Sequence, residues 1–165
     1  MWPRKSLNLL RKPMTSNTIT YEYFVSGRWR DQDKLFEICD VLDKAGKSYY
    51  CFLKNAHTNE LLNVSERSDD VEKVMSDFEA RKDWRNDPVI AEIFQQDMEG
   101  LRACENLLVL LPAGKSVHIE AGAAYGMGKP CIAIGEQKET ESLYMIFDNI
   151  FPTLDDFAAS LKGGA

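Results

Sequence analysis

The chain is poor in the residues that usually bind metals, and it has no motif of closely paired cysteines. Only two histidines occur among 165 residues, which disfavours a histidine-rich metal site, and no Cys-x-x-Cys sequence is present. The four cysteines, Cys39, Cys51, Cys104 and Cys131, are widely scattered, and three of them lie inside apolar runs. This distribution predicts buried free thiols in a reducing compartment, and therefore a cytoplasmic protein. We expect no cofactor.

Two further absences restrict the class of partner. No apolar run approaches the length of about 20 residues that a membrane-spanning helix needs. Acidic side chains outnumber basic ones by 26 to 20, so the formal net charge is -6, which argues against a nucleic-acid-binding surface. A small anionic ligand held by a few local groups is still compatible with this charge. We therefore expect a small-molecule ligand, with neither a membrane nor a nucleic acid as partner.

The length predicts a single domain with a sizeable core. Residues 1–17 are basic, contain two prolines and have an apolar part too short for a secretory signal, so we expect a disordered extension there and the domain at residues 18–162. Strands are predicted at residues 19–26, 48–53, 107–111 and 131–134, with a short last one at 143–147, and helices at about 33–45, 71–82, 88–104, 119–127 and 154–161. This order predicts an α/β fold: one doubly wound, mostly parallel sheet with helices on both faces, as in Rossmann-like and flavodoxin-like proteins.

The central strand–helix–strand unit, residues 106–135, contains the first candidate site residues. Ligands of open parallel sheets bind at the carboxyl ends of the strands, and that position holds Gly114, Ser116, His118 and Glu120. Glu120 is predicted at a helix start, where the helix dipole stabilises a carboxylate by about 0.3–1 kcal/mol. It is either a functional carboxylate or an ordinary first-turn glutamate. His118 is either a polar ligand contact or simply a helix-start residue.

Two loops contain residues suited to an anion. The segment Ala113–Ser116 resembles a phosphate loop, but the position that needs a glycine is Leu110, inside the strand, so we do not expect a Walker-type nucleotide hydrolase. A shorter phosphate contact from Ser116 and backbone N–H groups at the helix start remains reasonable.

The segment at residues 54–69 is polar, so we expect a surface loop there, which is a candidate lid over the site.

The second loop, Ser26–Arg30, follows the first strand and lacks the Gly-x-Gly-x-x-Gly pattern of dinucleotide-binding folds. Gly27 permits close approach of the backbone to a ligand, and Arg28 and Arg30 can form paired hydrogen bonds with phosphate oxygens. The alternative is a surface loop with two solvated arginines. Trp29 either stacks on a base or packs locally.

Asp97 is the second acidic candidate. It lies one helical turn from Ile93 and from Leu101, close to the apolar face of the helix predicted at 88–104. A carboxylate in that position points into a cleft, has a buried partner, or forms the polar edge of the apolar stripe.

Together these segments resemble the nucleoside 2-deoxyribosyltransferase family and its relatives that hydrolyse the N-glycosidic bond of nucleoside 5′-monophosphates. The most specific similarity is Glu120-x-Gly122-x-Ala124-x-x-x-Gly128-Lys-Pro, which matches the family's pattern around its nucleophilic glutamate. The segment from Tyr23 to Arg30 is similar to the family's first strand and its sugar- or phosphate-binding loop. Residues 97–101 are similar to its acidic helix, and the resemblance spans residues 21 to about 135.

The resemblance implies an enzyme that breaks a bond between a sugar and a base. Glu120 would be the nucleophile, Tyr23 would hold it by a hydrogen bond, and Asp97 would contact the substrate or assist proton transfer to the leaving base. Family members form homodimers or larger homo-oligomers in which a neighbour completes the site, so we expect the same here.

One departure from the family pattern decides between its two activities. Transferases of the family commonly have an acidic residue a few positions before the nucleophile, whereas residues 113–118 contain none. The monophosphate hydrolases have a serine in that loop, and Ser116 fits it. We therefore expect hydrolysis of a nucleoside 5′-monophosphate or nucleoside. The alternatives are a transferase that moves deoxyribose between bases, a non-catalytic nucleotide-binding or sensing module, and an enzyme that cleaves NAD or a related dinucleotide.

Overall fold

The computed structural model describes residues 19–54, 61–62 and 70–163. The extension expected at residues 1–17 and most of the candidate lid at residues 54–69 lie outside these ranges. No helix within the described ranges is both long enough and apolar enough to cross a bilayer. The four cysteines are buried and free, as predicted.

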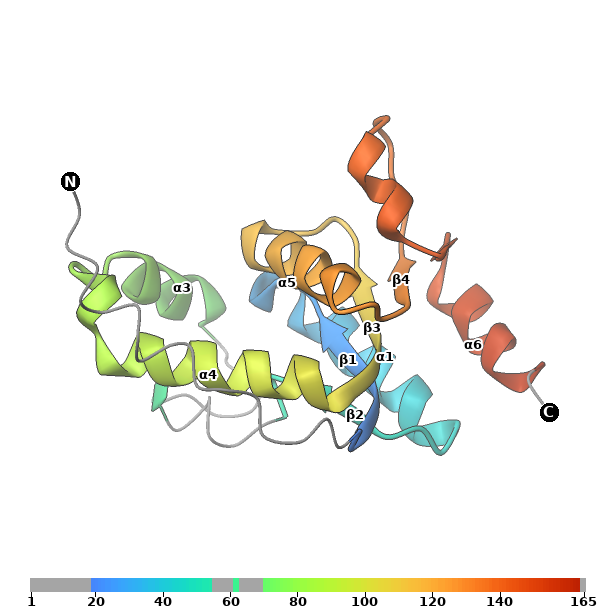
Figure 1. The fold of residues 1–165 in the computed structure, drawn as a ribbon, viewed down its shortest axis with the longest axis horizontal. Coiled ribbons are helices and arrows are strands. Elements are labelled where there is room, and N and C mark those ends of the chain that lie inside the picture. Colours follow the sequence, from blue (N-terminus) through green and yellow to red (C-terminus); the bar gives the residue numbers. More distant parts are fainter. Residues whose placement is uncertain (1–18, 55–60, 63–69, 164–165) are drawn as a thin grey trace.

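Five parallel strands form one sheet (Figure 1). They are β1 (Tyr21–Ser26), β2 (Tyr49–Cys51), β3 (Cys104–Leu110), β4 (Cys131–Ile134) and β5 (Asn149–Phe151), in the spatial order β2-β1-β3-β4-β5. The predicted α/β fold is confirmed, and this strand order is the flavodoxin-like one. In such sheets the order of strands reverses between β1 and β3, and ligands bind at the carboxyl ends of the strands beside that point.

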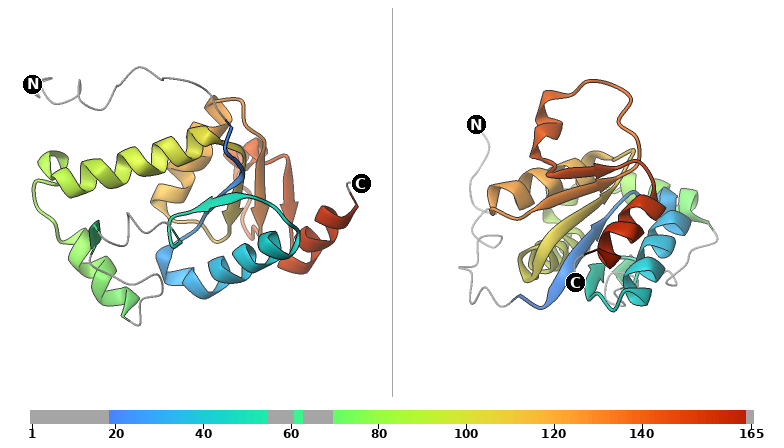
Figure 2. Two further views of the ribbon diagram at one scale, coloured as in Figure 1. Left: turned by 90° about the horizontal axis from the view of Figure 1, so that it is seen from below. Right: turned by 90° about the vertical axis from the view of Figure 1, so that its right-hand side faces the viewer.

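Helices cover both faces of the sheet (Figure 2). Helices α1 (Gln32–Lys44) and α6 (Leu154–Lys162) lie on one face, and α4 (Pro88–Ala103) and α5 (Lys115–Gly126) lie on the other. Each face has its own apolar core because successive strand side chains point to opposite sides. Phe24 and Leu107 belong to the core under α4 and α5, and Val25 and Leu108 to the core under α1 and α6. Helix α3 (Val71–Glu79) lies beyond the sheet, near the start of α4.

The prediction of a last strand at residues 143–147 is wrong. That segment forms the 3₁₀ helix η3 (Ser142–Ile146), and the last strand, β5, follows it. The side chain of Glu141 accepts a hydrogen bond from the backbone N–H of Leu143, which caps a helical turn. Leu143 and Met145 are 73% and 88% exposed, whereas Phe147 is buried and Tyr144 and Ile146 pack against the core under α4 and α5. The run therefore contacts the core along one side of a helical turn and not as a strand.

The position of Glu120 within its helix also differs from the prediction. Helix α5 begins at Lys115 rather than at Ile119, with Gly114 as the residue before it. Val117, Ala121 and Ala124 are its buried side chains, and their helical spacing includes the segment predicted to be a loop. Glu120 therefore lies in the second turn of α5, where the helix N-terminus contributes less to a carboxylate than at the first turn.

Candidate functional site

A pocket of about 730 Å³ opens at the carboxyl ends of β1 and β2. This volume is in the range of about 300–1,000 Å³ that is usual for small-molecule sites. Its polar wall consists of Arg28, Arg30, Gly114, Lys115, Ser116, Glu79, Asp97 and Glu120, and its apolar wall includes Phe24, Trp29, Phe52, Leu62, Met75, Phe78 and Ile93. Residues from both loops singled out in the sequence therefore meet here, together with α3 and α4.

Glu120 is a half-buried carboxylate whose position is determined by a neighbouring strand. The hydroxyl of Ser26, at the end of β1, donates a short hydrogen bond to Oε2 of Glu120. Burial removes water from the carboxyl group and raises the pKa of Glu120 to about 7, while the bond from Ser26 acts in the opposite direction. Glu120 thus changes protonation state near neutral pH, which an ordinary surface glutamate does not.

Asp97 supplies a second carboxyl group from α4. It lines the pocket and accepts a hydrogen bond of 3.3 Å from the hydroxyl of Tyr50. Burial raises the pKa of Asp97 to about 6, against the effect of the Tyr50 bond, and the charge of Asp97 adds to the increase in the pKa of Glu120. Of the alternatives left open by the sequence, the structure therefore selects a carboxylate that faces a cleft and has a partner.

Tyr50 reaches Asp97 because a glycine leaves room for its ring. The ring of Tyr50 stacks on Phe24 with centroids 5.1 Å apart, and a Cβ atom at Gly100 would lie 2.8 Å from Tyr50 ring carbons. Gly100 is one turn along α4 from Asp97, so α4 carries both the carboxylate and the gap for its hydrogen-bond donor. The sequence contained no motif for Tyr50, because only the pairing of β1 with β2 places it beside Phe24.

The opening of the pocket is positively charged on the side of α5. Lys115 and Ser116 form the first turn of α5, and Arg28 crosses over Gly114, whose missing side chain would lie 3.2 Å from Cγ of Arg28. Arg28 also forms an ion pair with Asp31, in which Nε lies 2.6 Å from Oδ2. Backbone N–H groups at the start of a helix bind anions, and here they lie beside two cationic side chains and a hydroxyl.

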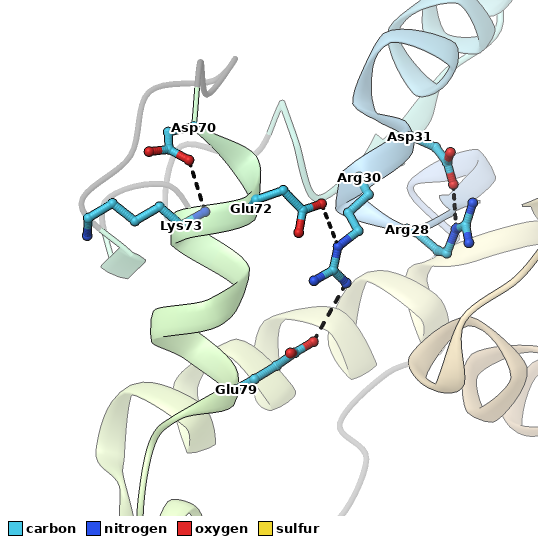
Figure 3. Close-up of polar contacts among 7 residues, drawn as sticks. All are labelled: Arg28, Arg30, Asp31, Asp70, Glu72, Lys73 and Glu79. Atoms are coloured by element: carbon cyan, nitrogen blue, oxygen red, sulfur yellow. Dashed lines mark hydrogen bonds and ion pairs between the residues drawn. The ribbon is translucent and has the colours of Figure 1, made fainter.

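Arg30 and Trp29 have structural contacts as well as positions on the pocket wall. Arg30 lies between two carboxylates of α3, with its Nε 2.8 Å from Glu72 Oε1 and Nη1 3.7 Å from Glu79 Oε1 (Figure 3). Trp29 is 8% exposed and packs edge-on against Phe52, with ring centroids 5.8 Å apart. Trp29 therefore packs locally, and Arg30 attaches α3 to the loop after β1.

Gly27 lines the pocket and is also required by the packing behind it. A Cβ atom at Gly27 would lie 2.5 Å from Cδ2 of Leu35 on α1, closer than two carbon atoms can approach. Gly27 therefore allows α1 to pack tightly against the end of β1 while the backbone borders the ligand space.

Two predicted site residues lie elsewhere. The ring of Tyr23 packs edge-on against Phe157 of α6, at a centroid distance of 6.0 Å, on the face of the sheet opposite Phe24. Side chains alternate along a strand, so Ser26 shares the face of Phe24 and Tyr23 does not. The hydrogen bond to Glu120 that we expected from Tyr23 is therefore made by Ser26.

His118 likewise does not belong to the pocket lining. Its Nδ1 lies 2.7 Å from the backbone oxygen of Gly114, and its Nε2 lies 2.8 Å from the hydroxyl of Tyr144. The two rings also stack, with centroids 5.8 Å apart. His118 thus attaches η3 to α5, and its expected role as a substrate contact is not supported by this position.

Comparison with known proteins does not assign the chain. No known family model matches it, and a search of curated proteins finds no significant relative. Within the described ranges, no group of three or more His, Cys, Asp or Glu side chains is arranged to hold a metal ion. The chemistry of this site is therefore argued from its own side chains.

Proposed function

We propose that this protein cleaves the N-glycosidic bond of a nucleoside 5′-monophosphate and releases the free base. One observation carries the proposal: a half-buried glutamate, bonded by Ser26, shares a pocket with a second half-buried carboxyl group, Asp97. Two carboxyl groups with raised pKa values in one cleft are typical of catalytic sites. In glycosidic cleavage one of them attacks the sugar, and the other transfers a proton.

The proposed reaction has two steps. Glu120 attacks the anomeric carbon as the bond from that carbon to the base nitrogen breaks, and the bonding electron pair leaves with the base. Asp97 gives its proton to the departing base, and a glycosyl ester of Glu120 remains. Asp97, now ionised, takes a proton from water, which attacks the same carbon and frees Glu120. Because Ser26 binds Oε2 of Glu120, Oε1 is the attacking oxygen.

This mechanism requires one proton on the pair of carboxyl groups, and it must be on Asp97. The pair titrates with pKa values of about 6 and about 7, so the singly protonated form is most abundant between them. Within that form the proton lies mostly on Glu120, whose pKa is the higher, so the reactive form with the proton on Asp97 is its minor tautomer. We expect the pH profile of kcat/KM to be bell-shaped, with its maximum between about pH 6 and 7.

The charge at the pocket opening supports a phosphorylated substrate over a plain nucleoside. Lys115, Arg28 and Ser116 lie together at the start of α5, one helical turn from Glu120. This turn separates the nucleophile from the anion-binding groups, much as a sugar separates its anomeric carbon from a 5′-phosphate. The expected homodimer or larger homo-oligomer stays a prediction, which sedimentation velocity measures directly.

Release of free base tests the proposal. Purified protein is incubated with a panel of nucleosides, 5′-monophosphates and NAD, with and without a second base, and the products are separated by chromatography. We expect base from monophosphates without an acceptor, and a loss of about 10³-fold or more in Glu120→Gln. Glu139→Gln, which changes an exposed loop glutamate, is the matched control.

The other outcomes identify the alternatives. A new nucleoside formed only when an acceptor base is present would indicate a transferase, and nicotinamide released from NAD would indicate a dinucleotide-cleaving enzyme. Saturable binding of a nucleotide without any product would indicate a binding module. Turnover by Glu120→Gln at the wild-type rate would exclude Glu120 as the nucleophile.

A further inference from the structure

The pocket extends beyond the groups that the proposed reaction uses. Helices α4 and α5 each run antiparallel to the strands, since α4 leads into β3 and α5 follows it. Their first turns therefore both lie toward the opening of the pocket. Ser116 lies on α5, one turn from Glu120 toward that opening. Ile93 lies on α4, one turn from Asp97 in the same direction. The two walls beyond the carboxyl pair thus differ, one being polar and the other apolar.

Helix α3 continues the apolar wall. Val71, Val74, Met75 and Phe78 are its half-buried residues, and their spacing puts them on one face. Val71, Val74 and Met75 pack against the core under α1, and Met75 and Phe78 also line the pocket with Ile93 and Phe52. The two ion pairs of Arg30 attach this helix to the loop after β1 (Figure 3). A fixed helix therefore presents two apolar side chains to the ligand space.

We infer that Met75, Phe78 and Ile93 bind the leaving base, and that the base of the preferred substrate carries an apolar alkyl or aryl substituent. The inference rests on the proposed function, because Asp97 must lie beside the leaving base to protonate it. Ile93 is the next residue toward the opening on the same helix face, so whatever projects from the base meets Ile93, Met75 and Phe78. These side chains offer no strong hydrogen-bond donor or acceptor.

The chemistry of this wall disfavours an unsubstituted base. Amino or carbonyl groups of a base that contact Met75, Phe78 and Ile93 would lose water without gaining a partner from these three side chains, which is costly. An alkyl or aryl group in the same place has no hydrogen bonds with water to lose, and the burial of its apolar surface is favourable. Methionine adapts its shape to different occupants, so Met75 suits a substituent of variable form.

A series of substrates tests the inference. Four deoxyadenosine 5′-monophosphates are compared, in which the exocyclic amino group is unsubstituted, methylated, butylated or benzylated. We expect kcat/KM to increase with apolar area, by about fourfold for each fully buried methylene. Phe78→Ala and the milder Ile93→Val should flatten this gradient, the first more than the second. Phe94→Ala, which alters an exposed residue of α4 outside the pocket lining, should keep it.

Binding separates the failure of this inference from the failure of the proposed function. The affinity of Glu120→Gln for the same four monophosphates is measured by calorimetry, which needs no turnover. Affinity that increases along the series supports the apolar wall, and equal affinities overturn it. Release of base from every compound at the same rate would also overturn it while leaving the proposed function intact. A graded affinity without any base release would contradict the proposed function instead.

Discussion

The chain contains two strand–helix–strand units that share a topology and differ in the size of the side chains that their helices bury. In the first, β1-α1-β2, helix α1 buries Leu35, Ile38, Cys39 and Leu42 against the sheet. In the second, β3-α5-β4, helix α5 buries only Val117, Ala121 and Ala124 and carries Glu120. Large side chains fill the space under α1. The small side chains under α5 fill less space and leave room for the carboxyl group of Glu120 beside the pocket. The second unit therefore has a less filled core and contains the reactive group.

Besides the pairing of β1 with β3, a side-chain hydrogen bond joins the two units at the pocket. Ser26 ends the first strand of the first unit, and Glu120 lies on the helix of the second. Ser26 is 1% exposed, so it is held as firmly as an apolar core residue while it orients the half-buried carboxylate. The first unit, with the larger core side chains, therefore positions the reactive group of the second unit. Substitutions in α1 should therefore change stability, and substitutions around Glu120 should change protonation and catalysis.

The largest effect on stability is expected in the first unit. Leu35 is completely buried beside Gly27, and Leu35→Ala should lower the free energy of unfolding by about 2–5 kcal/mol because it leaves a cavity in a packed core. Urea unfolding followed by circular dichroism measures the loss. Leu143→Ala removes an exposed leucine and should change stability by less than about 0.5 kcal/mol. Equal losses in both variants would show that α1 is not the packing unit.

A smaller effect of opposite sign is expected at Glu120. Its pKa is about 7 in the folded protein against a reference value of 4.5, so folding disfavours the ionised form. This group costs nothing below about pH 4.5 and costs most above about pH 7, and stability is lost as the pH rises between them. Glu120→Gln should therefore be more stable than wild type by about 1–3 kcal/mol at pH 8 and equal to it at pH 4.5.

Thermal unfolding at the two pH values measures this difference, with Glu139→Gln as the exposed control. A Glu120→Gln variant that is less stable than wild type at both pH values would mean that the carboxylate is a structural group. That result would remove the contrast between the two units.

Removing the hydrogen bond between Ser26 and Glu120 should shift the pKa of Glu120 by a modest amount. The hydroxyl of Ser26 lowers the pKa of Glu120, so Ser26→Ala should raise this pKa further. The alkaline limb of the pH profile of kcat/KM should therefore move to higher pH, because Glu120 has the higher pKa of the pair. Ser142→Ala, at an exposed position, should leave the limb in place. An unmoved limb in Ser26→Ala would show that Ser26 does not act on Glu120.

The smallest effect is expected at the attachment of α3. Arg30 is exposed, and its ion pairs with Glu72 and Glu79 are accessible to salt, so Arg30→Gln should leave the global stability unchanged within error. Hydrogen exchange should become faster in residues 71–79 and stay unchanged in α1. Unchanged exchange in α3 would show that its packing against the core, rather than Arg30, determines its position.

The alternation of apolar runs along the chain was sufficient to predict the fold, because parallel strands buried on both faces leave a recognisable pattern. The same pattern failed at residues 143–147, where the apolar run forms the helical turn η3 with Leu143 and Met145 exposed. Periodicity reports which residues are apolar, and it does not report whether a neighbouring element covers them. The start of α5 was misplaced for a related reason, since Val117 became recognisable as a helix residue only through its burial.

By itself, the sequence determined the parallel α/β fold, the buried thiols, and the location of Glu120 and of the loops at residues 26–30 and 113–116 at the carboxyl edge of the sheet. It left the position of Asp97 open between a cleft, a buried partner and the polar edge of its helix. Only the tertiary structure decided which groups meet there. It assigned the hydrogen bond of Glu120 to Ser26 instead of Tyr23, gave Asp97 the partner Tyr50, and moved His118 to Tyr144. The physical reason is that hydrogen bonds and pKa values depend on distances of a few ångströms between elements far apart in the chain, which no local pattern encodes.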